Sequence, residues 1–523
     1  MGAPPSGDAE LLRRRYLERS EAFLDGVRGR FALALHDRER GLALAARSAP
    51  GHASLAYVLD ERRFAVARES AELAALPGVG EALDELRLAE FYANEELSGP
   101  QAFFAAVREL LPGEQIAVDA RGVRSRELAR PRPGARLELP RFEDYVERFA
   151  GLLARSVERC LRGEERVAVL ASGGLDSSPI AALAARRLGG CDRVALLSWD
   201  VVDAAADDRP YVEALAAGLG TPLEWIPAAD AWPFADLSRW PVHPSTPEQT
   251  AYRWLHERSY ERAAALGFRV VLAGFGGDAL YGHAARWWPS LLAAEGPGAA
   301  IDRLREVARE VGWPRALRGC LLAPLRPHRS RLRRDPPAYL TRTARRRLSA
   351  RPRWPGDLGV ARRPRQAERL LALLDGHGEH VESWYTARHG VEQRTPARDP
   401  ALIEFALAVP DHVLLQGSET RAVLRAAVAG RLPEGVRGRR GKADLRALLL
   451  AGLGPGRIPW AGALLGRPDA LWRGLVEEAA VGRWLEGRFA ADAERVGFLN
   501  CLYGELWRER RRGAGTSSPF AHH

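Results

Sequence analysis

Two segments within the first 128 residues alternate between apolar and polar positions. Residues 29–47 read GRFALALHDRERGLALAAR, and residues 55–70 read LAYVLDERRFAVARES. Such alternation is typical of strands with one buried face, and the charged tetrapeptides at 37–40 and 60–63 are typical of turns. The pattern therefore predicts two antiparallel strand pairs in a β-rich N-terminal unit. A Pro- and Arg-rich stretch at residues 129–140 predicts a linker after this unit.

The pattern changes after the linker. Residues 141–161 predict an amphipathic helix, and residues 166–188 predict a strand, a glycine loop and a second helix. Further apolar runs at 192–200 and 268–278 predict buried strands, and the Arg- and Leu-rich remainder from 283 to 523 predicts helices. Strands that alternate with helices indicate a doubly wound parallel sheet. We therefore expect an α/β protein with one domain at residues 1–138 and a second at 139–523.

The composition says more about the cellular compartment of the protein than about its function. Hydrophobic residues make up 46% and charged residues 28% of 523 positions, and the net charge is +10. A positive charge favours nucleotides, nucleic acid or acidic peptides as partners, without selecting among them. The N-terminus has no apolar core for a secretory signal, and no apolar run reaches the roughly 18 residues of a membrane span. Four widely spaced cysteines predict reduced thiols in a cytoplasmic protein: Cys160, Cys191, Cys320 and Cys501.

A glycine-rich loop is the strongest functional signal in the chain. It follows a short apolar run, precedes a predicted helix, and consists of Ser172, Gly173, Gly174, Leu175, Asp176, Ser177 and Ser178. Glycines let the backbone approach a phosphate, and a helix N-terminus offers free N–H groups to it. Serine hydroxyls can donate to phosphate oxygens, and a carboxylate beside phosphates requires a bridging cation such as Mg²⁺. We predict a nucleotide phosphate site with Mg²⁺, and a serine-capped tight turn is the alternative.

The loop has neither the GxxxxGK[ST] pattern nor the GxGxxG pattern. It resembles the pyrophosphate loop of the ATP-pyrophosphatases, in particular the asparagine synthetases, which split ATP between the α- and β-phosphates. Further segments resemble the same family in the same order, namely residues 29–47, 111–119, 270–282, 390–410 and 424–445. The resemblance covers roughly residues 22–450. It implies a degenerate, truncated class II glutamine amidotransferase domain, followed by an α/β ATP-pyrophosphatase domain with a helical C-terminal part.

The amidotransferase half departs from this family at its nucleophile. Its members use an N-terminal cysteine, exposed by removal of Met1, and the α-amine of that cysteine acts as the base. Position 2 here is Gly2, and Arg47 matches a family arginine but is followed by a serine. We expect that glutamine hydrolysis is lost and that the domain is a structural platform. A wrongly assigned start codon is the alternative.

The second glycine loop departs from the family at Phe275. The resemblance assigns Asp278, together with Asp176, to Mg²⁺ binding. Three residues before this aspartate, asparagine synthetases have a glutamate that handles the proton of ammonia, and β-lactam-forming relatives have a tyrosine. Phenylalanine is neither acid nor base, which argues against ammonia as the nucleophile. Both departures fit the lasso peptide cyclases, which adenylate an Asp or Glu side chain of a peptide and close a macrolactam onto its N-terminal amine.

Lys442 is the only lysine among the 77 lysines and arginines. It matches the catalytic lysine of the family. A compact ammonium can donate in any direction, first to phosphates and then to a tetrahedral oxyanion, whereas a planar guanidinium donates in a fixed fork. The resemblance also places Ser198 and Gly274 near the nucleotide. A surface lysine without a role is the alternative for Lys442.

Several further residues have weaker assignments. Arg394, Pro396 and Asp399 match a family signature and are interpreted as mainly structural. Asp207 and Asp208 resemble a family acidic pair, with a solvated loop as an equal alternative. Four residues could act as general base, although each is more often a packed residue: Tyr281, His283, His389 and Glu392.

The leading hypothesis is an ATP-dependent ligase that forms a lasso peptide macrolactam through an acyl-adenylate and releases AMP and pyrophosphate. The resemblance implies a precursor peptide as substrate, and a leader-peptide-binding protein and a leader protease as partners. The alternatives are an ammonia-dependent asparagine synthetase or other amidating enzyme, and a tRNA-modifying adenylase. Nucleic acid is the weaker candidate, because the Arg-rich region at 303–369 has a solvated helix face as its simplest interpretation. An apolar peptide pocket or core packing would explain six tryptophans near the loops: Trp225, Trp232, Trp240, Trp254, Trp287 and Trp288.

Overall fold

The computed structural model describes most of the chain. The described residues are 7–513 without 51–53, 96–98, 130, 132–135, 190–191, 202–206, 282–286, 319–334, 351–376, 417–418, 440, 442–444 and 455. Gly2, Cys191, His283, Cys320 and Lys442 lie outside the described residues. Predictions that rest on these five side chains therefore stay predictions.

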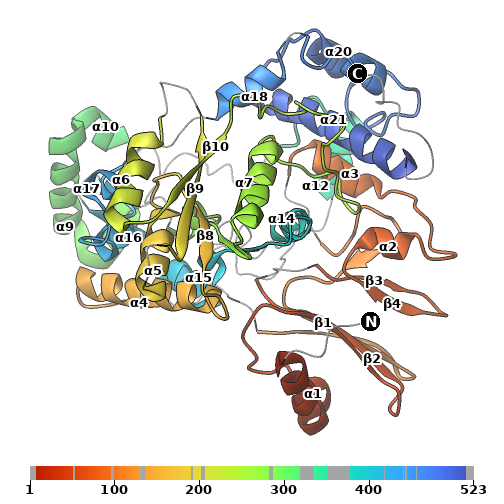
Figure 1. The fold of residues 1–523 in the computed structure, drawn as a ribbon, viewed down its shortest axis with the longest axis horizontal. Coiled ribbons are helices and arrows are strands. Elements are labelled where there is room, and N and C mark those ends of the chain that lie inside the picture. The colour runs from red at the N-terminus through yellow and green to blue at the C-terminus, as the bar shows by residue number, and fades with distance from the viewer. Residues whose placement is uncertain are drawn as a thin grey trace.

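The N-terminal unit contains two antiparallel sheets, with strand orders β1-β2-β6-β7 and β4-β3-β5 (Figure 1). The strands are β1 (Ala32–Asp37), β2 (Leu42–Arg47), β3 (Ala56–Leu59), β4 (Phe64–Ala67), β5 (Arg108–Glu109), β6 (Glu114–Asp119) and β7 (Gly122–Glu127). The β1–β2 and β3–β4 pairs confirm the two predicted strand pairs. The helices are α1 (Gly7–Arg19), the 3-10 helix η1 (Ser20–Ala22), α2 (Ser70–Ala74) and α3 (Glu85–Tyr92).

Alternation along β2 explains how this unit is layered. Leu44 faces a core that includes Tyr16 of α1, and the next residue, Ala45, faces a core that includes Tyr57 of the second sheet. Successive side chains of a strand point to opposite faces, so one strand serves both cores. The first sheet is therefore covered by α1 on one side and by the second sheet on the other.

A five-stranded parallel sheet forms the centre of the larger unit, with strand order β10-β9-β8-β11-β12. Its strands are β8 (Val167–Leu170), β9 (Val194–Asp200), β10 (Leu223–Pro227), β11 (Val270–Leu272) and β12 (Glu392–Arg394). The helices that accompany it are α4 (Phe142–Cys160), α5 (Ser178–Leu188), α6 (Arg209–Leu219) and α7 (Arg253–Ala265). The predicted doubly wound α/β sheet is confirmed. Its strand order reverses between β8 and β11, and the carboxyl ends of strands at such a reversal are where α/β sheets bind ligands.

The C-terminal part is mostly helical, as predicted. The helices are α8 (Gly277–Tyr281), α9 (Trp287–Val311), α10 (Trp313–Leu317), α12 (Arg342–Ala350), α14 (His377–Ala387), η4 (Pro396–Arg398), α15 (Pro400–Ala408), η5 (Asp411–Leu414), α16 (Ala422–Ala427), α17 (Glu434–Arg437), α18 (Arg446–Gly452), α19 (Ala461–Leu465), α20 (Glu478–Leu485) and α21 (Asp492–Gly513). The purely helical prediction is wrong at β12, and also at the small hairpin of β13 (Leu415–Gln416) and β14 (Glu419–Thr420). β12 consists of three polar residues that pair with β11 through the backbone, so no apolar pattern marks it.

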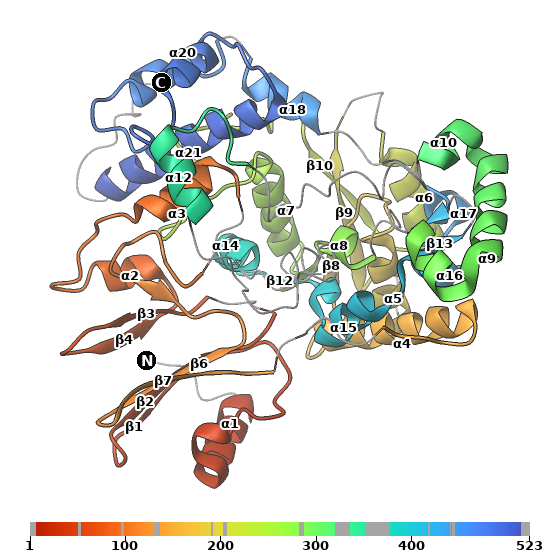
Figure 2. The ribbon, with the colours of Figure 1, turned by 180° about the vertical axis from the view of Figure 1, so that it is seen from behind.

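The two units share a hydrophobic core. Helix α3 lies beside α12 and α21 (Figure 2), and its Phe91 and Tyr92 belong to a cluster with aromatic residues of the C-terminal helices. The hydroxyl of Tyr339 donates to the carbonyl of Tyr92 at 2.9 Å, and the amide of Asn500 donates to the carbonyl of Phe91 at 2.7 Å. The N-terminal unit is thus built into the rest of the molecule, and a domain boundary at residue 138 stays a prediction.

The described helices and cysteines give no further information about the cellular compartment. None of the described helices combines the length and the apolar composition that crossing a bilayer requires. Cys160 and Cys501 are free thiols, and burial raises the pKa of Cys160 to about 11. A thiol with such a pKa is protonated at neutral pH and is a weak nucleophile.

Candidate active site

The glycine-rich loop joins β8 to α5 at the reversal of strand order. Gly173 has a φ of +60°, and a Cβ added to it would lie 2.5 Å from the Cβ of Tyr211. Only glycine fits there, because the backbone is left-handed and α6 is in direct contact. The hydroxyl of Ser177 accepts from the backbone N–H of Ser172 at 3.3 Å. Ser178 is fully buried, and its Oγ has no hydrogen-bond partner among the described residues.

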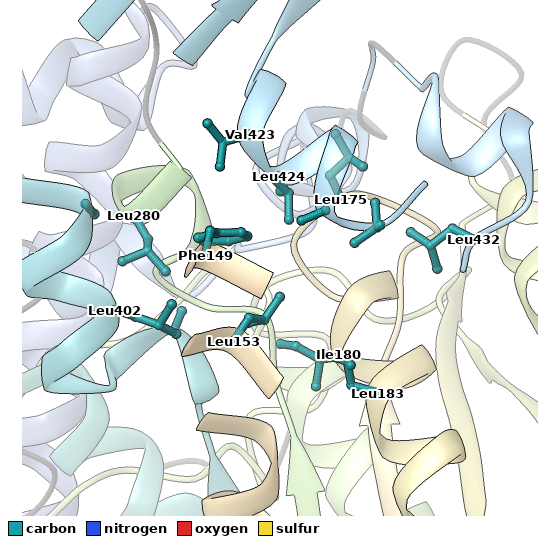
Figure 3. Packing of buried hydrophobic residues seen from close by; sticks show 14 of the residues in the cluster. Phe149, Leu153, Leu175, Ile180, Leu183, Leu280, Leu402, Val423, Leu424 and Leu432 are labelled. Carbon is teal, nitrogen blue, oxygen red and sulfur yellow. The ribbon is translucent and has the colours of Figure 1, made fainter. Parts of the chain in front are cut away.

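Leu175 ties this loop to the hydrophobic core. It is 4% exposed and belongs to the cluster that contains Phe149 and Leu153 of α4 and Ile180 of α5 (Figure 3). Leu424 of α16 belongs to the same cluster. The loop is therefore held by the packing of helices from distant parts of the chain as well as by its own glycines.

The second glycine loop, which follows β11, packs directly on the first. A Cβ added to Gly274 would lie 2.8 Å from the carbonyl carbon of Asp176, and one added to Gly277 would lie 2.7 Å from Oδ1 of Asp176. Asp278 follows in the first turn of α8. Because β8 and β11 are adjacent and parallel, both loops leave the same edge of the sheet. The structure thus brings together Asp176 and Asp278, the two predicted metal ligands.

Arg421 lies between these two carboxylates. Its Nη1 donates to Oδ1 of Asp176 at 2.8 Å, and its Nη2 donates to Oδ1 of Asp278. Arg421 has a φ of +59°, which residues other than glycine rarely adopt. Backbone strain of this kind is concentrated at functional sites. The sequence analysis missed Arg421, because only the fold brings residue 421 to the two loops.

The donor set of this site fits a magnesium nucleotide. Asp176 and Asp278 face a single cationic group, so two carboxylates converge on one point. Carboxylates and phosphate oxygens are the ligands that Mg²⁺ prefers. The buried hydroxyl of Ser178 and the N-terminus of α5 lie on the same loop as Asp176 and are suited to phosphate oxygens.

Arg439 holds the segment that leads to Lys442 against the first loop. Its Nη1 donates to the carbonyl oxygen of Ser172 at 2.6 Å, and its guanidinium lies 4.2 Å from the ring centroid of Tyr211. The same guanidinium pairs with Asp208, which gives this predicted acidic residue a partner within the site. Lys442 itself lies outside the described residues, three positions further along the chain.

Ser198 lies close to the loop on the neighbouring strand. It is 2% exposed, near the carboxyl end of β9. The backbone N–H of Ala171, which precedes the loop, donates to the carbonyl of Leu197 at 2.9 Å. The predicted nucleotide residues Ser198 and Gly274 therefore flank the first loop on its two sides.

A cavity of about 420 Å³ lies beside the second loop. Phe275, which is 40% exposed, forms part of its wall. The opposite wall comes from the N-terminal unit, with Phe91 and Glu95, and further wall comes from α7 and α14. The cavity is therefore enclosed by elements from both halves of the chain.

Behind Phe275 lies a buried ionic cluster that the sequence analysis missed. His256 stacks on Phe275, with ring centroids 5.7 Å apart. Glu382 of α14 accepts two hydrogen bonds from Arg253, at 3.1 and 3.0 Å, and lies 3.3 Å from Nδ1 of His256. Burial would raise the pKa of Glu382, but the positive charge of Arg253 holds it well below its usual range. Glu382 is an ionised and fully paired carboxylate, which makes it a wall residue rather than a ready base.

Comparison with protein-family models assigns both parts of the chain. A family model described as asparagine synthase matches residues 148–507, more than half of the chain. The chain belongs to the asparagine synthase family. A model described as a glutamine amidotransferase domain matches residues 4–128 of this asparagine synthase family member, in agreement with the expected N-terminal unit.

Three curated relatives match part of the chain. Asparagine synthetase [glutamine-hydrolyzing] 3 of Bacillus subtilis is 26% identical over 229 residues, which cover 41% of this chain and 37% of that protein. Asparagine synthetase [glutamine-hydrolyzing] 2 of Bacillus subtilis is 26% identical over 196 residues, covering 35% and 26%. Amidase chyE of Penicillium rubens is 28% identical over 188 residues, covering 34% and 27%. The matches therefore span between 26% and 37% of the length of these relatives.

In this asparagine synthase family member, the structure describes the side chains of two of the four weaker base candidates. Glu392 is the first residue of β12, so it lies at the end of the parallel sheet away from the two loops. His389 pairs with Glu257 at 2.8 Å. The side chains of Tyr281 and His283 lie outside what the structure describes.

The signature around residue 396 has structural contacts, in agreement with its interpretation from sequence. Arg394 donates to the carbonyl of Cys160 at 2.8 Å, and the hydroxyl of Ser156 donates to the carbonyl of Pro396 at 2.7 Å. Asp399 caps α15 by accepting from the N–H of Ala401 at 2.9 Å. These bonds hold α15 and β12 on α4.

The tryptophans Trp240 and Trp254 belong to the shared core. They are 4% and 9% exposed, and their rings pack edge to face at 5.8 Å. Core packing accounts for both rings, but both also line a cavity of about 580 Å³, so the peptide-pocket prediction stays open for them.

Proposed function

We propose that this protein is an ATP-dependent ligase that activates a carboxylate as an acyl-adenylate and joins it to an amine carried by a peptide. The finer form of the proposal is closure of a lasso peptide macrolactam between an Asp or Glu side chain and the N-terminal amine. Membership of the asparagine synthase family and the two converging loops support the adenylation step.

The proposed nucleophile is inferred from the wall of the cavity beside the second loop. Phe275 stands there without a titratable group, and the cavity of about 420 Å³ is within the range of pockets that take small organic ligands. Ammonia would need only a small part of this volume and a group to accept its proton. An amine that belongs to a larger substrate fits both properties of the cavity.

In the first step, the substrate carboxylate attacks the α-phosphate and pyrophosphate leaves. The loop at residues 172–178 would bind the leaving phosphates through backbone N–H groups and Ser178, and Asp176 and Asp278 would hold Mg²⁺. Bound Mg²⁺ would neutralise charge on the phosphates. Arg421, already within reach of both carboxylates, would keep them in place.

In the second step, the amine attacks the acyl carbon and AMP leaves. Negative charge then moves to the oxygen of the tetrahedral intermediate. We assign its stabilisation to Lys442, which follows Arg439 by three residues, and Arg439 contacts the first loop directly. A positioned positive charge at a developing oxyanion is usually the largest single contribution to such a step.

The N-terminal unit is proposed to act as a platform and not as a glutaminase. Residues 1–138 contain no cysteine, and the family chemistry needs a cysteine thiol. Arg47, which matches a family arginine, donates to the carbonyl of Leu110 at 2.9 Å inside this unit. The unit would contribute Phe91 and Glu95 to the substrate wall.

A leader-peptide-binding protein and a leader protease complete the proposal, and both rest on the likeness to lasso cyclases alone. The proposed cytoplasmic location rests on the widely spaced cysteines. Nucleic acid is not proposed as a substrate, and tRNA serves as one arm of the test.

The test measures pyrophosphate release from Mg-ATP under four conditions. The protein is given a precursor core peptide, aspartate with ammonium, tRNA, or no further addition. Release with the peptide, together with a product lighter by one water, is the expected result. Lys442→Ala should abolish formation of the dehydrated product, and Lys442→Arg should restore little of it, because the guanidinium fork cannot replace the ammonium. Release with aspartate and ammonium would instead support the second candidate, an asparagine synthetase, which the names of two relatives favour.

A further inference from the structure

Three buried side chains from distant segments meet where the N-terminal unit contacts α14. Glu69 follows β4, His243 lies in the segment between β10 and α7, and His380 belongs to α14. Their exposed fractions are 6%, 0% and 2%. One ligand atom from each lies within 4.8 Å of the other two. The proposed ligation chemistry does not use any of them.

The contacts among the three side chains converge on one oxygen. Oε2 of Glu69 lies 3.6 Å from Nε2 of His243 and 3.4 Å from Nε2 of His380. Both distances exceed those of a good N–H···O hydrogen bond. They agree with the separation of about 3.4 Å between two ligands of a tetrahedral zinc ion, each roughly 2.0–2.1 Å from the metal.

The carboxylate of Glu69 is only partly satisfied by hydrogen bonds. Its Oε2 accepts one from the hydroxyl of Ser245 at 2.8 Å. Its second oxygen, Oε1, is buried and has no hydrogen-bond partner among the described residues. Its nearest basic partner there is Nε of Arg68, 3.9 Å away. A buried carboxylate with this single short hydrogen bond is better satisfied when a cation binds as well.

We propose that Glu69, His243 and His380 form a zinc site that joins the N-terminal unit to α14. Two imidazoles and one carboxylate leave a fourth position for water, as in other zinc sites with three protein ligands. The site lies one helical turn or less from Glu382 on α14, which forms part of the wall beside Phe275. The zinc ion would therefore hold α14, and with it this wall, against the N-terminal unit.

One existing contact has to change when the metal binds. Nδ1 of His243 accepts from the backbone N–H of Ser245 at 3.1 Å, so this ring carries its proton on Nε2 in the described arrangement. Zinc on Nε2 would shift that proton to Nδ1 and break the contact with Ser245. Nδ1 of His380 has no hydrogen-bond partner among the described residues, so a proton there displaces nothing. The loss of one hydrogen bond is small beside the binding of a structural zinc ion.

The first test is the metal content of the full chain, purified without a histidine tag and dialysed against metal-free buffer. We expect about one zinc per chain, and at least a tenfold lower content in Glu69→Gln and in His380→Ala. The control is His389→Ala, which removes the histidine of a different His–Glu pair, 2.8 Å apart, and should retain the metal. Absence of zinc from the wild type even after incubation with zinc, or equal zinc in all variants, would overturn the proposal.

A second measurement does not depend on whether the variants fold. Cobalt(II) added to the metal-free wild type should bind with a stoichiometry of one and give the intense visible bands of a tetrahedral ion, without a thiolate charge-transfer band. A weak octahedral spectrum, a thiolate band, or iron as the bound metal would each overturn the assignment. Because these measurements need neither ATP nor a peptide, they succeed or fail independently of the proposed ligase activity.

Discussion

The nucleotide side and the substrate wall of this protein are built in different ways. On the nucleotide side, two short glycine loops leave adjacent strands and contact one another, with Gly274 and Asp176 in direct backbone contact. The substrate wall is made of side chains from α3, α7 and α14, held by the ion pair of Glu382 with Arg253. Each loop of the first region is a short continuous segment, whereas the second region is assembled from single side chains of distant helices.

This difference suggests which part of the site family members are expected to share, the backbone loops, and which part can change in one member, the side chains of the wall. Backbone loops bind phosphates with little dependence on side chains, so any carboxylate can be activated there. A wall of side chains can be altered residue by residue, as Phe275 illustrates. Function within the family is therefore expected to diverge at the wall while adenylation is retained.

The largest effect is predicted for Gly274→Ala. The added Cβ would lie 2.8 Å from the carbonyl carbon of Asp176, and backbone cannot move aside cheaply. A displacement of even about 1 Å at the reacting groups costs roughly 100-fold in rate, so pyrophosphate release should fall at least that far. The control is Gly298→Ala, where nothing lies within 4 Å. Normal release by Gly274→Ala would mean that the two loops do not form one site.

The next effect tests the wall through its buried ion pair. Glu382→Gln would leave the buried guanidinium of Arg253 with only the longer contact to Glu257, 3.9 Å away, and breaking a buried pair costs about 3–5 kcal/mol. We expect a loss of unfolding free energy near the lower end of that range, measured by urea denaturation. Glu478→Gln is the control, because Glu478 pairs with Arg473 at the surface with 73% of its side chain exposed. Equal midpoints for the two variants would show that the cluster does not support the wall.

The same difference between local loops and distant side chains decides how much of the site could be predicted from the sequence. The loop at residues 172–178 and its place after β8 were predictable, because an apolar run, glycines and a helix start stand together in the chain. β12 was not, since three polar residues join the sheet only through backbone bonds to β11. Nor were Arg421 or the group around Glu382, because their partners are more than 100 residues away. Long-range side-chain contacts leave no local pattern.

A smaller effect concerns the pH dependence of stability around η5. His412 lies in η5, which packs against α9 and α16, and its Nδ1 lies 3.0 Å from the hydroxyl of Ser290. Burial, with the positive charges of Arg136 and Arg303, lowers the pKa of His412 to about 4. The unfolded chain takes up this proton near pH 6.5 and the folded protein only near pH 4, so the unfolding free energy falls as pH is lowered between these values. The loss amounts to at most about 3 kcal/mol.

The measurement is the unfolding free energy as a function of pH, compared between the wild type and His412→Gln. The variant should show a flatter dependence between pH 4 and 6.5, because glutamine does not titrate. An unchanged slope would mean that other groups cause the acid sensitivity of this region.

The smallest predicted effect is the most direct test of whether the two regions act independently. Phe275→Ala removes a ring that is 40% exposed, so stability should change little. Pyrophosphate release with the peptide should stay within about twofold, because the proposed adenylation step assigns no role to Phe275. Formation of the amide should fall about tenfold, or roughly 1.4 kcal/mol, because the wall that orients the amine loses its apolar face. Phe275→Leu keeps an apolar group and should recover most of this loss. If both steps slowed equally, adenylation and amide formation would depend on the same wall, and the nucleotide side could not be treated as independent of it.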